Sequence, residues 1–88
     1  MITVYVLLSA KDSNFYVGMT NNLTKRIHDH NSAKVRSTKS RTPFSLLYSE
    51  EHSNRKIARA REKYLKSSAG KRYLQKFFAQ QQPSHLPD

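Results

Sequence analysis

The alternation of apolar and polar residues predicts a β-hairpin at the start of the chain. Residues 2–8 read Ile-Thr-Val-Tyr-Val-Leu-Leu, which is apolar on both faces and rich in β-branched and aromatic residues, as is typical of a central strand. A polar turn at 11–14 separates them from a second strand at 15–19. Gly18 lies inside this second strand, which indicates a bulge or a close approach of another group to the backbone.

The register of the hairpin decides where two tyrosines lie. If residues 11–14 form a four-residue loop, Ala10 faces Phe15, and Tyr5 and Tyr16 lie on the same side of the sheet. A shift of one residue would place the two rings on opposite sides.

The rest of the chain alternates helical and extended patterns. In order, they predict a helix from Asn21 or Asn22 to His30, a loop over 31–42, a strand over 44–48, a helix from Ser53 or Asn54 to about Lys66, a break over 67–70 and a short helix over 71–78. We expect one domain over 1–78, of the α/β (α+β) class with element order β-β-α-β-α-α. The polar residues 79–88 are expected to form an unstructured tail.

Two polar residues fall on the inner stripe of the first predicted helix. A projection at about 100° per residue places Arg26 and His30 beside the apolar residues Leu23 and Ile27. The alternative for each is a structural role, with Arg26 extending past the edge of the core and His30 buried with satisfied hydrogen bonds.

Glu62 is the only acid of the second predicted helix, and it lies near the margin of the apolar stripe. Its alternative role is a helix ion pair with Lys66 or Arg59, which contributes only a few tenths of a kcal/mol.

The charge of the chain indicates its partner. Sixteen Lys and Arg against six Asp and Glu give a formal net charge of +10, and most of the excess lies beyond residue 20. A polyanion is the natural partner, because each neutralised phosphate releases counterions. The loop over 31–42 combines hydroxyl residues with four cations and no acid, which favours phosphate binding. The alternatives are a merely solvated surface and a helix lying on a membrane.

Composition excludes several classes of protein. The chain has no cysteine, which rules out a disulfide framework, a thiolate metal site and a thiol nucleophile. Its longest apolar run, over 4–8, is too short to span a membrane, and the first residues lack the features of a secretion signal. We therefore expect a soluble, cytoplasmic protein with no membrane partner.

The remaining residues include one candidate for each part of a phosphodiester-cleaving site. Such a site needs a metal ion held by carboxylate oxygen, a base for the attacking water and a cation facing the charge on phosphorus. Glu62 is the candidate carboxylate and Arg26 the candidate cation. His30, Tyr5 or Tyr16 is the candidate base or its orienting partner, although strand tyrosines commonly serve only in packing.

Four segments carry a resemblance to a known family. Thr3-Val4-Tyr5 stands at the position of a first signature, Tyr16-Val17-Gly18 matches a second, residues 22–30 carry an Arg and a His four apart, and residues 60–66 carry the Glu. In this order and spacing they resemble the GIY-YIG nuclease superfamily, and within it small single-domain members similar to the nuclease domains of the excision-repair incision subunit and of structure-selective endonucleases. The likeness covers residues 2–75.

The resemblance implies a three-stranded antiparallel sheet flanked by helices, and a metal-dependent endonuclease that hydrolyses DNA at branched or structured sites. It implies a catalytic set with one Mg²⁺ or Mn²⁺ ion on the carboxylate: Tyr5, Tyr16, Arg26, His30 and Glu62. Gly18 would have a structural role beside this set. We expect nucleic acid to contact seven basic residues: Lys34, Arg36, Lys39, Arg41, Arg59, Lys63 and Lys66. Specificity would come from substrate shape, a protein partner or self-association.

Two other function classes stay open at the level of sequence. One is a non-catalytic nucleic-acid-binding module that retains the nuclease fold. It is favoured by the absence of any Asn after residue 54, because many members of the family carry an Asn after the Glu. The other is a ribosome-associated or RNA-binding basic protein, which explains the charge but not the spacing of the signature residues.

Overall fold

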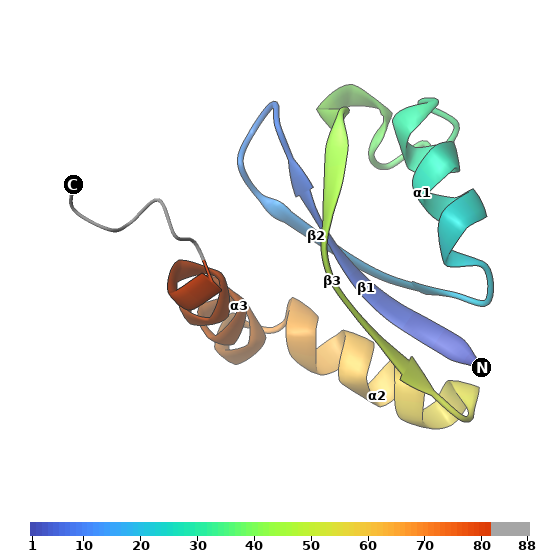
Figure 1. Ribbon diagram of the computed structural model, residues 1–88, viewed down its shortest axis with the longest axis vertical. Coiled ribbons are helices and arrows are strands. Elements are labelled where there is room, and N and C mark those ends of the chain that lie inside the picture. The colour runs from blue at the N-terminus through green and yellow to red at the C-terminus, as the bar shows by residue number, and fades with distance from the viewer. Residues whose placement is uncertain (82–88) are drawn as a thin grey trace.

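A three-stranded antiparallel sheet forms the centre of the molecule (Figure 1). The computed structural model describes residues 1–81. Its strands are β1 (Ile2–Ser9), β2 (Phe15–Thr20) and β3 (Phe44–His52), and their order across the sheet is β2-β1-β3. The predicted central position of the first strand is therefore confirmed.

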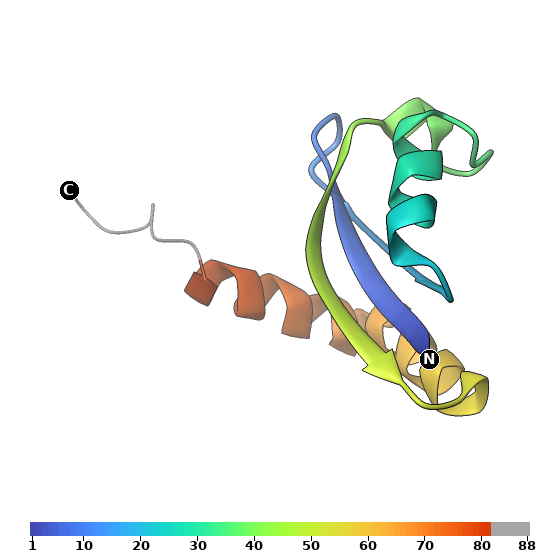
Figure 2. The same ribbon diagram turned by 45° about the vertical axis from the view of Figure 1, so that its right-hand side comes forward.

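Helices cover both faces of the sheet. The helical segments are α1 (Leu23–Asn31), the short 3₁₀ helix η1 (Lys39–Arg41), α2 (Arg55–Lys66) and α3 (Ser68–Gln81). α1 lies on one face, and α2 with α3 lies on the other (Figures 1 and 2). The predicted fold class and the element order β-β-α-β-α-α are confirmed.

Asparagine side chains begin both of the predicted longer helices. Asn22 Oδ1 accepts a hydrogen bond from the backbone N–H of Lys25 at 3.1 Å, and Asn54 Oδ1 accepts one from Ile57 at 2.9 Å. Each cap satisfies a backbone donor that the first helical turn leaves free. Of the alternative caps that the sequence allowed, Asn22 and Asn54 are the ones used.

The hairpin turn is wider than predicted. Phe15 pairs with Leu8, not with Ala10, so the predicted register is wrong by two residues. The cause is the buried side chain of Ser9, whose Oγ accepts hydrogen bonds from the backbone N–H groups of Lys11 (3.1 Å) and Asp12 (3.2 Å). These bonds start the turn at Ser9. A shift of two residues keeps the same faces, so Tyr5 and Tyr16 do lie on one side, as predicted.

β3 runs past its predicted end at 48 and finishes at His52. The polar residues 49–51 predict a strand end, but Glu50 has partners within the fold. Its Oε2 accepts hydrogen bonds from Arg61 Nε at 2.8 Å and from His52 Nε2 at 2.7 Å. Because these bonds offset the cost of partly burying the carboxylate, the strand continues.

The break between α2 and α3 is shorter than predicted. It is confined to Ser67, and α3 begins at Ser68. Gly70, expected in the break, lies inside α3, where an added Cβ would collide with the backbone at Tyr64 and Leu65. Glycine therefore lets α3 pack closely on the end of α2. α3 continues to Gln81, so residues 79–81 of the predicted tail are helical, while 82–88 lie outside the described residues.

The sheet separates two clusters of packed side chains. Towards α2 and α3 lies a purely apolar cluster of buried residues: Val4, Val6, Val17, Ala58, Leu65, Leu74 and Phe78. Towards α1 lies a smaller cluster of buried residues, with partly buried neighbours on β2 and α1: Tyr5, Leu7 and Phe44. Alternate residues of β1 supply the two clusters, as the pleat of a strand requires.

Candidate active site

Three of the expected catalytic side chains meet on the α1 face of the sheet. The hydroxyl of Tyr5, on β1, lies 3.0 Å from Nε2 of His30, at the end of α1. The ring of Tyr16, on β2, lies edge-on to the His30 ring with a centroid distance of 4.9 Å, and 6.4 Å from the ring of Tyr5. Residues from three separate elements thus form one aromatic cluster.

Gly18 makes room for this cluster. It lies opposite Tyr5 in the hairpin, and a Cβ added there would come within 2.5 Å of the Tyr5 hydroxyl oxygen and 2.7 Å of Cζ. The close approach expected at Gly18 is therefore made by the phenol of Tyr5. Any larger residue would displace the ring that contacts His30.

A threonine from the loop is the second hydrogen-bond partner of His30. His30 Nδ1 lies 2.8 Å from Oγ1 of Thr38, and both residues are fully buried, with 0% exposure. The Thr38 hydroxyl also lies 3.4 Å from the carbonyl oxygen of Val35. If Thr38 donates to that carbonyl, it accepts from His30 Nδ1–H, and in the neutral imidazole Nε2 is the acceptor of the Tyr5 O–H.

The surroundings of His30 and Tyr5 favour the uncharged form of each side chain. Burial lowers the pKa of His30 below its ordinary value, and the nearby positive charge of Arg26 lowers it further. Burial raises the pKa of Tyr5, while the guanidinium of Arg26 opposes that rise and the charges of Tyr16 and Glu62 add to it. At neutral pH the pair is a phenol donating to an unprotonated imidazole.

Arg26 lies where the cluster meets the surface. It belongs to α1, and its pKa is raised chiefly by interaction with the Tyr5 hydroxyl. It also lines a surface hollow of about 300 Å³ at the start of α1. Arg26 is therefore placed to contact both Tyr5 and a molecule bound in the hollow.

Glu62 approaches from the opposite face of the sheet. It lies on α2, its side chain is only 15% exposed, and Oε2 is 3.1 Å from Nζ of Lys66. The helix ion pair named above as its structural alternative thus exists. Among the described residues its link to the cluster is only electrostatic: its charge is the smallest of the influences that raise the pKa of Tyr5.

The residues present fit a hard divalent cation that keeps most of its own water. In the part of the chain that the structure describes, no three His, Cys, Asp or Glu residues come together as a metal cage. Mg²⁺ commonly binds through one or two carboxylates, with water and substrate phosphate filling its other positions. The single, largely buried carboxylate of Glu62 suits this mode of binding.

Six of the seven basic residues expected to contact nucleic acid are exposed: Lys34, Arg36, Lys39, Arg59, Lys63 and Lys66. The first three lie on the loop between α1 and β3, and the last three lie on α2. Both positively charged segments flank the sheet that carries the aromatic cluster.

Arg41, the seventh, pairs with an acid of the hairpin turn. Its Nε lies 2.6 Å from Oδ2 of Asp12, and its Nη2 donates to the carbonyl oxygens of Asn14 (3.2 Å) and Phe15 (3.4 Å). This ion pair lowers the pKa of Asp12 to about 2, chiefly through the hydrogen bond from Arg41. Arg41 thus ties the loop to the hairpin turn.

Sequence reasoning missed Thr38, Asn31 and Phe44. The side chain of Asn31 accepts from the backbone N–H of Phe44 at 2.7 Å and donates to its carbonyl oxygen at 3.2 Å. This pairing holds the Phe44 ring 5.8 Å from the ring of His30. No local pattern marks Thr38 among the hydroxyl residues of its loop; an asparagine ending a helix just before a loop was the one available signal for Asn31.

Comparison with known proteins identifies the family of the chain. Residues 1–76 match the family model described as the GIY-YIG catalytic domain, and the chain belongs to this family. It is 41% identical over 73 residues to a UPF0213 protein of Clostridium perfringens, covering 82% of this chain and 77% of that protein. It is 40% identical over 77 residues to a UPF0213 protein of Limosilactobacillus reuteri, covering 84% of this chain and 78% of that protein.

A third relative is the UPF0213 protein YazA of Bacillus subtilis, which is 35% identical over 69 residues, or 77% of this chain and 70% of that protein. No solved structure matches the chain. Among residues 1–81, no helix combines the length and the apolar character needed to cross a bilayer. The family is one of nucleases, which implies a nucleic-acid substrate.

Proposed function

We propose that the protein is a metal-dependent endonuclease that hydrolyses DNA phosphodiester bonds at branched or structured sites. The observation that carries the proposal is the buried chain of hydrogen bonds from Tyr5 through His30 to Thr38. These bonds would also satisfy a structural histidine. What favours the catalytic role is that Tyr16 and Arg26 lie beside the bonded pair in a domain of the GIY-YIG family.

This hydrogen-bonded chain supplies a base for the attacking water. Tyr5 would take a proton from water while its own hydroxyl proton passes to Nε2 of His30, so that no phenolate need accumulate. The lowered pKa of His30 keeps the imidazole unprotonated at neutral pH and ready to accept. Of the three candidate bases, Tyr5 and His30 are both fully buried and Tyr16 is partly exposed. Water would therefore reach Tyr5 from the Tyr16 side, and His30 would act through Tyr5.

Arg26 and Glu62 would act on the phosphate. The Arg26 guanidinium, which interacts with the Tyr5 hydroxyl, would pair with the charge that develops on phosphorus. Glu62 would hold a Mg²⁺ or Mn²⁺ ion, which supplies Lewis-acid stabilisation of the same charge. Tyr16, at the open side of the cluster, would border the attacking water.

The exposed lysines and arginines of the loop and of α2 would bind the DNA backbone. Such contacts position a strand without reading its sequence. Preference for a branched or structured site would then come from the shape of the DNA, from a protein partner or from a second copy of the chain.

The test is cleavage of flap, junction, duplex and single-stranded DNA in Mg²⁺ or Mn²⁺, with Glu62→Gln compared against Glu51→Gln. Both variants remove one negative charge, but Glu51 is exposed on β3. We expect Glu62→Gln to lower cleavage at least about a hundredfold while DNA binding survives, and Glu51→Gln to cleave normally.

Two results would contradict the proposal. Binding of DNA without cleavage of any substrate by the unaltered protein would leave the non-catalytic binding module as the function. Equal cleavage by the two variants would show that Glu62 is not the metal-binding group.

A further inference from the structure

Thr38 links the loop between α1 and β3 to the aromatic cluster. Of residues 31–42 it is the only one that is buried, and its Oγ1 lies 2.8 Å from Nδ1 of His30. The backbone N–H of Thr38 donates to the carbonyl oxygen of Val35 at 3.1 Å, and its hydroxyl lies 3.4 Å from the same oxygen. A turn of the loop therefore holds Thr38 in place while its hydroxyl reaches the ring of His30.

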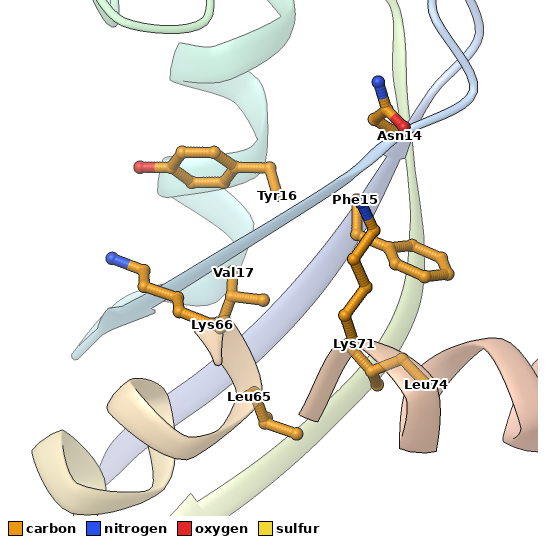
Figure 3. Close-up of a pocket in the computed structure, with 8 residues that line it drawn as sticks. All are labelled: Asn14, Phe15, Tyr16, Val17, Leu65, Lys66, Lys71 and Leu74. Atoms are coloured by element: carbon orange, nitrogen blue, oxygen red, sulfur yellow. The ribbon is translucent and has the colours of Figure 1, made fainter. Parts of the chain in front are cut away.

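Aromatic packing around His30 restricts the plane of its ring. The imidazole lies edge-on to the rings of Tyr16, Phe44 and Tyr5, with centroid distances of 4.9, 5.8 and 5.9 Å. Figure 3 shows the Tyr16 ring on the α1 side of β2 and Val17 on the side of α2. These contacts do not choose between the two neutral forms of the imidazole, because the Nδ1–H and Nε2–H tautomers have the same shape. The hydrogen bonds of the ring make that choice.

In the Nε2–H tautomer, one hydrogen of the cluster finds no acceptor. Nε2–H would donate to the hydroxyl oxygen of Tyr5, which also interacts with the guanidinium of Arg26, a group with donors only. The hydrogen of Tyr5 would be left over, since within residues 1–81 its hydroxyl forms no hydrogen bond with another acceptor. Tyr5 is 1% exposed, and an unpaired buried donor is costly. Its oxygen, accepting from both neighbours, would also be closed to a hydrogen bond from water.

In the Nδ1–H tautomer, each of these hydrogens has a partner. Nδ1–H donates to Oγ1 of Thr38, and the Thr38 hydroxyl donates to the carbonyl oxygen of Val35. The Tyr5 hydroxyl donates to Nε2, and its oxygen interacts with Arg26. That oxygen keeps the capacity to accept a hydrogen bond from water, as a base for the attacking water must.

We propose that Thr38 is a positioning residue that holds His30 in the Nδ1–H tautomer and so keeps Nε2 as the acceptor of the Tyr5 proton. The inference rests on the proposed function. As Tyr5 takes a proton from water, its own proton moves to Nε2, His30 becomes an imidazolium and the hydroxide attacks phosphorus. The bond from Nδ1–H to Thr38 then carries charge and strengthens. Thr38 contacts neither the water nor the phosphate and acts only through His30.

The first measurement is NMR of the ring nitrogens of His30 at neutral pH in the metal-free protein, which distinguishes a protonated nitrogen from a bare one. We expect the proton on Nδ1 in the unaltered protein and in Thr38→Ser, which keeps the hydroxyl. Thr38→Val keeps the shape and removes the hydroxyl, so each tautomer then leaves one buried hydrogen unpaired. Both tautomers should therefore be populated in Thr38→Val.

The second measurement is single-turnover cleavage per folded molecule. Thr38→Val should slow cleavage about 10- to 100-fold, the scale of losing one hydrogen bond to a charged group, while Thr38→Ser restores the rate. Thr20→Val is the matched control. The Thr20 hydroxyl accepts from the backbone N–H of Asn22 at 3.0 Å and lies 3.4 Å from its carbonyl oxygen, at the opposite end of α1 from His30. That variant should lose stability but keep the tautomer and the rate.

Three results would overturn the inference: a proton on Nε2 in the unaltered protein, an undivided Nδ1–H signal in Thr38→Val, or equal cleavage by Thr38→Val and Thr38→Ser. The first needs no variant, so the inference can fail even if Thr38→Val does not fold. Cleavage that depends on Glu62 but not on the Thr38 hydroxyl overturns the positioning role alone. Absence of cleavage by the unaltered protein overturns the proposed function and the positioning role with it.

Discussion

The two faces of the three-stranded sheet are packed with different kinds of side chain. Towards α2 and α3, the buried cluster contains only apolar side chains, among them Val4, Val6 and Leu65. Towards α1, the residues that are fully buried include His30, Thr38 and the Tyr5 phenol. Within the residues that the structure describes, every buried side-chain nitrogen and oxygen nevertheless has a hydrogen-bond partner.

The two kinds of packing contribute differently to the stability of the fold and to the chemistry of the site. Apolar contacts stabilise the fold in proportion to the area buried and impose little direction, so that similar residues can replace one another. Hydrogen bonds on the α1 face fix the orientation of each group, because a buried polar atom that loses its partner is costly. We expect changes on the α1 face to alter the chemistry more than the stability, and changes on the other face to do the reverse.

The largest effect is expected from Tyr5→Phe. Loss of the proposed proton acceptor should lower the cleavage rate by about 10²- to 10⁴-fold, as for other general bases. The unfolding free energy should fall by only about 1–3 kcal/mol, because His30 Nε2 loses its donor. Single-turnover cleavage and urea unfolding measure the two effects.

Tyr48→Phe is the matched control for this variant. Its hydroxyl donates to Glu50 on the opposite face of the sheet. A similar loss of stability with an unchanged rate per folded molecule is expected. If the two variants slow cleavage equally, the comparison between the faces is wrong.

Val6→Ala should have the next largest effect, and it should be confined to stability. Val6 is fully buried in the apolar cluster, on the side of the sheet that faces α2 and α3. Loss of two methyl groups and the cavity left behind should lower the unfolding free energy by about 2–3 kcal/mol. Thermal or urea unfolding measures this loss, and cleavage corrected for the folded fraction should stay normal. A lowered rate per folded molecule would show that the core also shapes the site.

The smallest effect is expected from pH, through His30. Unfolded histidine titrates near a pKa of about 6.5, and burial places the pKa of His30 below that value in the folded protein. As pH falls below about 6.5, the unfolded chain binds a proton before the folded one does, so stability declines until the lower folded pKa is passed. Cleavage should decline at the lower pKa, because protonated Nε2 no longer accepts from Tyr5.

Unfolding of His30→Gln between pH 7 and 5 measures this contribution. That variant should lose part of the pH dependence, whereas His28→Gln should keep it, because His28 is exposed on the outer side of α1. Identical pH profiles for His30→Gln and the unaltered protein would mean that His30 titrates normally.

Local patterns in the sequence were sufficient for the order of the elements. β1 is apolar on both faces because it is the central strand, and the two asparagines begin their helices through bonds three residues away. The hairpin register was missed because it depends on the Ser9 side chain, which has no signature in the pattern. The end of β3 was missed because Glu50 finds its partner Arg61 on α2.

The same distinction applies to the candidate site. The spacing of the signature residues pointed to Tyr5, Tyr16, Arg26, His30 and Glu62. The structure brings Tyr5, Tyr16 and His30 into one cluster with Arg26 at its margin, while Glu62 lies on α2 and pairs with Lys66. The spacing carried no information about the hydrogen bond of Thr38 with His30, or about the ion pair of Arg41 with Asp12. These assignments needed the positions of segments far apart in the chain.

The sequence by itself therefore determined the elements, the two faces of β1 and the residue types available for chemistry, because these depend on neighbours along the chain. Tertiary structure decided which polar groups form hydrogen bonds or ion pairs with one another. Tyr5 lies 25 residues from His30, and Arg41 lies 29 residues from Asp12, so folding alone selects these partners. It also lowers the pKa of His30, because burial and proximity to Arg26 are properties of the folded chain.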